Sequence, residues 1–182
     1  MLRVFIGQYP PKIPEETALE WVRECLEAIL PAARDAGIKV ALEVHSFEGR
    51  GKKVNGTSDS SMCRRVTDAI ASPWLGILWD VGNPYDEGET LAETWPNVKD
   101  HLLYLHVKDL KLLPAGAKYV LNGEGEVDLP GIIELLRHQG FTGWLSYEWE
   151  KKWHPELAGP EVALPHYITS MRSLLKKGTA GR

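Results

Sequence analysis

Four polar side chains follow apolar stretches of the chain, at points where β-strands are expected to end. The stretches read ALEVH, ILWDVGN, LYLHVKD and LSYEWE, and their polar residues are Glu43, Asp80, His106 and Glu148. Burying a carboxylate without a partner is costly, so residues of this kind at one end of a sheet must share protons, pair with cations or bind a metal. Each residue alone would be an ordinary ion-pair or hydrogen-bonding residue. The coincidence of four favours metal ligation.

Three oxygen ligands and one nitrogen ligand suit a divalent metal ion such as Mn²⁺, Mg²⁺, Co²⁺ or Zn²⁺. A structural zinc site would favour thiolates, but Cys25 and Cys63 fall in helix-like segments far apart in the sequence. An ion with open coordination positions can bind both oxygens of an α-hydroxy carbonyl compound. It then stabilises the charge that develops when the neighbouring C–H proton leaves.

The elements that must position these residues alternate between strand and helix. Apolar runs predict strands at residues 2–7, 38–44, 75–82, 101–107 and 144–150. Helical spacing predicts helices at 15–36, from Thr57 or Ser58 to Ile70, and at 88–99, 129–138 and 160–176, with a loop at 121–128. This alternation indicates an α/β fold with a parallel sheet and outer helices, in which ligands bind at the carboxyl ends of the strands.

The composition indicates one globular domain over residues 1–182, with 177–182 as a flexible tail. The net charge is −4, which argues against a nucleic-acid or anionic membrane partner. No apolar run is long enough for a transmembrane helix, and the start of the sequence does not have the pattern of a signal peptide. Together with the scarcity of cysteine, these features predict a cytoplasmic location.

The ordered series ALEVH, WDVGN, LHVKD and NGEGEVDLPGIIELLRHQGFTGWLSYEWE resembles the sugar phosphate isomerase/epimerase family, the xylose isomerase-like TIM barrels, over about residues 2–175. The resemblance implies that Glu43, Asp80, His106 and Glu148 bind one divalent metal. It also implies that Glu43 and Glu148 are catalytic and exchange the α-proton of the substrate. The expected activity is isomerisation or epimerisation of a sugar, sugar phosphate or related hydroxy-carbonyl compound through a metal-stabilised enediolate.

Four further residues are candidates for substrate binding. His45 shares a strand face with Glu43 and is expected to bind a substrate hydroxyl or to orient that glutamate. Asn83 stands where many family members carry a histidine, and an amide can bind a hydroxyl but cannot shuttle a proton. Lys108 and Asp109 follow the histidine of the fourth strand and are expected to bind substrate oxygens or to pair with each other.

The number of strands departs from the family pattern. A complete eight-stranded barrel takes about 200 to 250 residues, whereas this sequence predicts five strands that correspond to strands 4–8. The expected fold is therefore a partial TIM-type barrel that lacks the first three β/α units. Its two open edges predict a homo-oligomer, most simply a dimer.

Three other functions are compatible with parts of the pattern. An inosose or dehydroshikimate-type dehydratase of the same superfamily would share the first chemical steps. A truncated, catalytically inactive chain would keep the metal or sugar site as a binding module. An endonuclease of the related DNA-repair branch is disfavoured, because it would need more histidine ligands and a basic surface.

Overall fold

A parallel sheet with outer helices forms the body of the protein in the computed structural model, which describes residues 1–7, 12–45, 60–114 and 116–177. The elements succeed one another in the expected alternation. They are β1 (Leu2–Val4), α1 (Glu15–Asp35), β2 (Val40–Glu43), α2 (Ser60–Ile70), β3 (Leu75–Asp80), α3 (Gly82–Asp86), α4 (Leu91–Val98), β4 (Leu102–Val107), β5 (Asp109–Leu113), β6 (Gly116–Val120), α5 (Leu129–His138), β7 (Trp144–Tyr147) and α6 (Pro160–Lys177).

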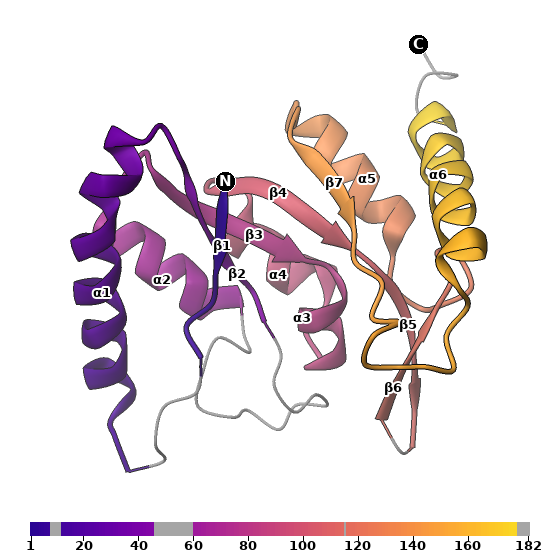
Figure 1. Cartoon of the computed structure of the whole chain (residues 1–182), viewed down its shortest axis with the longest axis horizontal. Coiled ribbons are helices and arrows are strands. Elements are labelled where there is room, and N and C mark those ends of the chain that lie inside the picture. Colours follow the sequence, from indigo (N-terminus) through magenta and orange to yellow (C-terminus); the bar gives the residue numbers. More distant parts are fainter. Residues whose placement is uncertain (8–11, 46–59, 115, 178–182) are drawn as a thin grey trace.

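The five-stranded sheet has the order β1-β2-β3-β4-β7, and every neighbouring pair is parallel. Helix α1 lies toward the β1 end of the sheet and α6 toward the β7 end (Figure 1). Strand residues such as Val40, Leu42, Ile77 and Leu105 pack with helix residues such as Leu26 in one apolar core. The predicted partial TIM-type barrel is thus confirmed.

Both outer strands of this sheet have an open side within the described part of the chain. Strand β1 pairs only with β2, and β7 pairs only with β4. Parallel strands without a second neighbour leave backbone N–H and C=O groups free to pair with further chain. Large apolar side chains are exposed near both edges, including Leu2 on β1 and Trp144 on β7.

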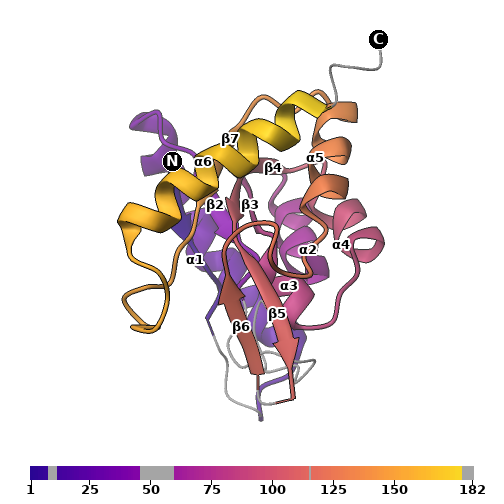
Figure 2. The same ribbon diagram turned by 90° about the vertical axis from the view of Figure 1, so that its right-hand side faces the viewer.

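An antiparallel hairpin of β5 and β6 comes directly after β4 and was not predicted. It extends beyond the carboxyl ends of the sheet strands (Figures 1 and 2). The pattern of this stretch is weak because Lys111 and Lys118 face each other across the hairpin and interrupt its apolar residues. The short helix α3 was also missed, since five residues show no helical period.

Helix starts and strand ends differ by a few residues from the sequence prediction. Helix α4 begins at Leu91 because Thr90 and Glu93 form a capping box, in which each side chain bonds the backbone N–H of the other residue. Strand β1 ends at Val4 and β7 at Tyr147, both earlier than predicted. The predicted start of the second helix lies outside the described residues. Of the predicted tail, Lys177 belongs to α6, and the residues after it lie outside the described part of the chain. None of the helices described is long and apolar enough to cross a membrane.

Candidate metal centre

The polar residues at four strand ends lie together at one place on the sheet. Glu43 ends β2, Asp80 ends β3, His106 lies one residue before the end of β4, and Glu148 comes directly after β7. One potential ligand atom from each lies within 4.8 Å of the others. The side chains of Glu43 and Asp80 are fully buried, whereas that of Glu148 is 20% exposed. The cluster is therefore closed on the β2–β3 side and more accessible on the β7 side.

Backbone N–H groups at the start of α3 hold the carboxylate of Asp80. Its Oδ1 atom accepts hydrogen bonds from the N–H groups of Gly82 at 2.8 Å and Asn83 at 2.9 Å. The turn from β3 into α3 therefore fixes the orientation of this carboxylate. Its second oxygen, Oδ2, lies 2.8 Å from the ammonium of Lys108.

Glu43 is held from the edge strand by Arg3. The guanidinium donates from Nε to Oε2 of Glu43 at 2.8 Å, and its Nη2 atom contacts the same oxygen. The other oxygen, Oε1, lies 3.1 Å from Nδ1 of His106. Burial of a carboxylate without a cation beside it is costly, and Arg3 supplies that cation.

Glu148 is held in a similar way by a cation that comes directly after β4. Lys108, which is only 2% exposed, donates from Nζ to Oε2 of Glu148 at 2.9 Å. Oε1 of Glu148 lies 3.2 Å from Nδ1 of His106. The imidazole therefore stands between the Oε1 atoms of both glutamates.

These contacts shift the protonation of the cluster. Burial lowers the pKa of His106, but the carboxylates of Glu148 and Glu43 outweigh it and raise the pKa to about 9. Burial, the largest effect on Asp80, raises the pKa of that carboxyl well above its usual range. Burial also works against the charged forms of Glu148 and Lys108. Their contacts with neighbouring groups are stronger, so the pKa of Glu148 is lowered and the pKa of Lys108 is raised.

Three buried atoms of the cluster have no hydrogen-bond partner among the described residues: Glu43 Oε1, Asp80 Oδ2 and His106 Nδ1. Their nearest charged contacts are ion pairs, Glu43 Oε1 with His106 Nδ1 at 3.1 Å and Asp80 Oδ2 with Lys108 Nζ at 2.8 Å. Buried polar atoms of this kind call for an explanation. Two carboxylate oxygens and one imidazole nitrogen, which a metal would bind in place of the imidazolium proton, form a donor set that fits a divalent cation.

The predicted substrate-binding residues fall into different positions. His45 faces the cluster, with its Nδ1 atom 3.4 Å from Glu43 Oε2 and its ring 4.8 Å from that of Phe5. Asn83 is buried, and its side-chain amide donates to the carbonyl of Val44 at 3.1 Å, which ties α3 to the end of β2. Lys108 lies inside the cluster, where its ammonium contacts Asp80 and Glu148.

Asp109 bonds to the backbone of a neighbouring loop. Both of its oxygens accept backbone N–H bonds, Oδ2 from Gly123 and Gly125, and Oδ1 from Leu110 and Val127. A side chain at Gly125 would place a Cβ atom 2.0 Å from Asp109 Oδ1, so the loop passes as close as a glycine allows. Substrate binding by Asp109 stays a prediction. The side chain organises the loop between β6 and α5.

Sequence reasoning missed Arg3. The residue lies in the middle of β1 and is in register with Ala41, which places it on the same face as Glu43 two residues later. A charged residue inside the short apolar run LRVFIG was the available signal. Its partner was not evident, because the contact spans two strands.

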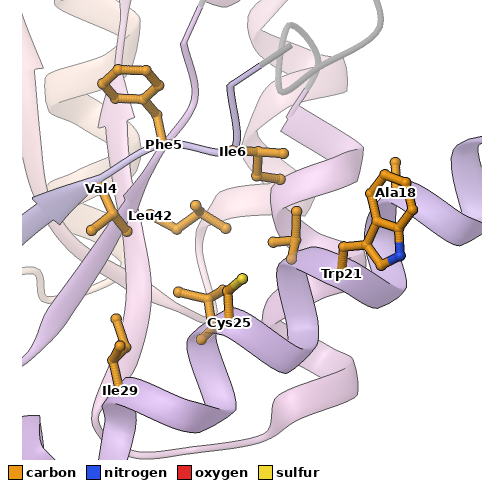
Figure 3. Close-up of a pocket in the computed structure, with 10 residues that line it drawn as sticks. Val4, Phe5, Ile6, Ala18, Trp21, Cys25, Ile29 and Leu42 are labelled. Atoms are coloured by element: carbon orange, nitrogen blue, oxygen red, sulfur yellow. The ribbon is translucent and has the colours of Figure 1, made fainter. Parts of the chain in front are cut away.

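A large apolar cavity of the described chain lies elsewhere. It has a volume of about 430 Å³ and lies between β1, the residues after it, and α1. Trp21, Cys25 and Ile29 line one wall and Val4 and Ile6 the other (Figure 3). No residue of the carboxylate–histidine cluster lines it.

The fold and the cluster define a parallel β/α half-barrel with three carboxylates and one histidine at its strand ends. The chain belongs to the xylose isomerase-like TIM barrel family, whose profile matches residues 1–174. This confirms the resemblance seen in the sequence motifs.

Individual relatives show the same likeness. The chain is 26% identical over 169 residues to an inosose dehydratase of Lacticaseibacillus casei, a match that covers 83% of this chain and 54% of that protein. The chain thus spans about half the length of this relative. A crystal structure of IolI protein with a bound zinc atom superposes with a TM-score of 0.75 at 18% identity, covering 94% of this chain and 61% of that one. A structure of L-ribulose 3-epimerase gives a TM-score of 0.73 at 12% identity, covering 95% and 58%. At these identities the two structures establish a shared fold.

Proposed function

We propose that this chain binds one divalent metal ion through Glu43, Asp80, His106 and Glu148 and acts on a sugar-like hydroxy-carbonyl compound. The observation that supports this most is a cluster of four residues in which three buried potential ligand atoms form no hydrogen bond with the described residues. Mn²⁺, Mg²⁺, Co²⁺ and Zn²⁺ all suit this donor set. The zinc atom of the IolI structure, which shares the fold, is in keeping with such a site.

The proposed reaction is proton transfer next to a carbonyl group, as in an isomerase or epimerase. When bound, the metal polarises the substrate carbonyl as a Lewis acid. A carboxylate oxygen of Glu148, the more accessible of the two glutamates, removes the α-proton, and an enediolate results. For isomerisation, Glu148 returns the same proton to the neighbouring carbon. For epimerisation, a protonated Glu43, on the opposite side of His106, delivers its proton to the other face. Lys108 and Arg3 hold both carboxyl groups in place during these steps.

A dehydratase is the second candidate, and the Lacticaseibacillus casei relative carries that name. Removal of the same α-proton would begin this reaction, and loss of a neighbouring hydroxyl group as water would complete it. The two reactions therefore need the same cluster and differ in the step after proton removal. A third candidate is a metal- or sugar-binding module without turnover, since the chain spans about half the length of this relative.

The test is turnover of a panel of inososes and ketoses by the purified chain, before and after metal removal. We expect activity that is abolished by a chelator and restored by Mn²⁺ or another of the four ions. A product of unchanged composition with one inverted stereocentre would identify an epimerase, and one with a displaced carbonyl group would identify an isomerase. A product that has lost one water molecule would identify a dehydratase. Metal binding without any turnover would support the third candidate, a binding module. Full activity in metal-free protein would contradict the proposal.

A further inference from the structure

The two glutamates of the cluster are held by the same arrangement from opposite sides. In each, Oε2 is bonded to a cation from another part of the sheet, Arg3 for Glu43 and Lys108 for Glu148. In each, Oε1 faces Nδ1 of His106, at 3.1 Å and 3.2 Å. In both carboxylates, therefore, Oε2 contacts a cation and Oε1 points toward the imidazole.

We infer that Arg3 and Lys108 are a matched pair of positioning residues that keep Oε1 of both glutamates turned toward the metal centre. The inference rests on the proposed function, because it assigns the Oε1 atoms to the metal. In this role neither cation is itself a metal ligand. Each acts through the glutamate that it holds.

Arg3 has the geometry that this role needs. Its Nε and Nη2 atoms both contact Oε2 of Glu43, so the planar guanidinium fixes the carboxylate in direction as well as in charge. Nη2 also lies 4.0 Å from Oε1 of Glu148, which places Arg3 within reach of both glutamates. The guanidinium in turn lies 5.6 Å from the centre of the Phe5 ring, a cation–π contact that supports its position.

Lys108 performs the corresponding task from inside the cluster. Its ammonium bridges Glu148 and Asp80 and lies 5.4 Å from the centre of the Tyr119 ring. Because the side chain is only 3% exposed, it cannot exchange these partners for water. Removing it would leave Asp80 Oδ2 and Glu148 Oε2 without the cation that bridges them.

Positioning of this kind is measurable, since residues that orient metal ligands typically change metal affinity or activity about 10- to 100-fold when mutated. The experiment compares wild-type protein with Arg3→Met, Arg3→Lys and Lys108→Met by calorimetric titration with Mn²⁺. Arg23→Met serves as the matched control, because Arg23 pairs with Glu20 on the exposed surface of α1. We expect Arg3→Met and Lys108→Met to weaken Mn²⁺ binding at least about 10-fold. Arg3→Lys keeps the charge but not the two donors of the planar guanidinium, so it should recover part of the lost Mn²⁺ affinity. The Arg23→Met control should match wild type.

A second readout does not depend on metal binding. The ¹⁵N chemical shift of His106 Nδ1 in metal-free protein reports on the two facing oxygens. It should change in Arg3→Met and stay unchanged in Arg23→Met. If wild-type protein takes up no Mn²⁺, the proposed function fails, but this shift still decides whether Arg3 orients the cluster. Should Arg3→Met not fold, Arg3→Lys replaces it in both measurements. An unchanged His106 shift, or Mn²⁺ affinity in the Arg3 variant equal to that of wild type, would overturn the inference.

Discussion

Oε1 of Glu43 lies 3.1 Å from Nδ1 of His106, although the two residues stand on strands that β3 separates. The contact forms across the sheet because both side chains leave the carboxyl ends of their strands on the same face. Glu148 approaches the same nitrogen from the end of β7 at 3.2 Å. The imidazole is therefore the point on which the two proposed proton-transfer residues converge.

Replacement of either glutamate by glutamine should abolish turnover while the fold is kept. The amide matches the carboxylate in size but cannot exchange a proton and binds metal poorly. We expect Glu148→Gln and Glu43→Gln to lower kcat by about 100- to 10,000-fold, the usual range for loss of a general acid or base. Unchanged circular dichroism would confirm the fold, and near-normal rates in either variant would refute the two-glutamate mechanism.

His106→Ala should lower metal affinity, because it removes the only nitrogen ligand of the proposed site. His101→Ala is a matched control, since His101 directly precedes the first residue of β4 and pairs with Asp68 on the surface. We expect calorimetric Mn²⁺ titration to show weaker binding in the first variant and wild-type binding in the second. Equal binding in both would show that the ligand is misassigned.

The stability of the metal-free protein should depend on the protonation of His106. Its pKa in the folded chain is raised from 6.5 to about 9, so the imidazolium contributes stability that is fully present below pH 6.5. That contribution, on the order of 3 kcal/mol from the size of the shift, is lost as the pH rises through about 9. Urea unfolding of metal-free protein between about pH 6 and about pH 10 measures it. His106→Gln should show a flatter profile, and a wild-type profile as flat as that of the variant would contradict the assignment.

We propose that a second copy of the chain covers the open edges of the sheet. The β1 edge adjoins an apolar cavity, and Leu2, Phe5 and Trp21 near it are each about half exposed. Unpaired strand edges and contiguous apolar surface both favour association, most simply as a two-fold dimer. Light scattering at low micromolar concentration should therefore give a dimer.

Trp21→Glu would place a charge in the wall of that cavity and should shift the protein toward monomer. Leu113→Glu, on the hairpin, is the control and should stay dimeric. A monomeric wild-type protein with cooperative thermal unfolding would contradict this proposal.

The parallel sheet and the strand-end residues were predictable because each depends on a local pattern. Apolar runs ending in Glu43, Asp80 and His106 indicate both the strand and its exit. Glu148 was identified in the same way, although β7 ends one residue before it.

The remaining features depend on contacts that a local pattern does not contain. The pairing of Arg3 with Glu43 requires the register of β1 and β2, and the role of Asp109 requires the path of a distant loop. Lys108 was recognised as part of the site, but its position between Asp80 and Glu148 depends on the arrangement of three strands. The hairpin β5–β6 was missed because its sequence alternates weakly.

We propose that Glu43, Asp80, His106 and Glu148 together bind one divalent metal ion. Calorimetric titration of chelator-treated, dialysed protein with Mn²⁺ tests it most directly, in parallel with the Asp80→Asn variant. Asp80→Asn retains the Oδ1 atom that accepts from the start of α3 but weakens the ligand, so it separates metal binding from folding. We expect one Mn²⁺ per wild-type chain and much weaker binding in the variant. No Mn²⁺ uptake by folded wild-type protein, or equal uptake by the variant, would contradict it.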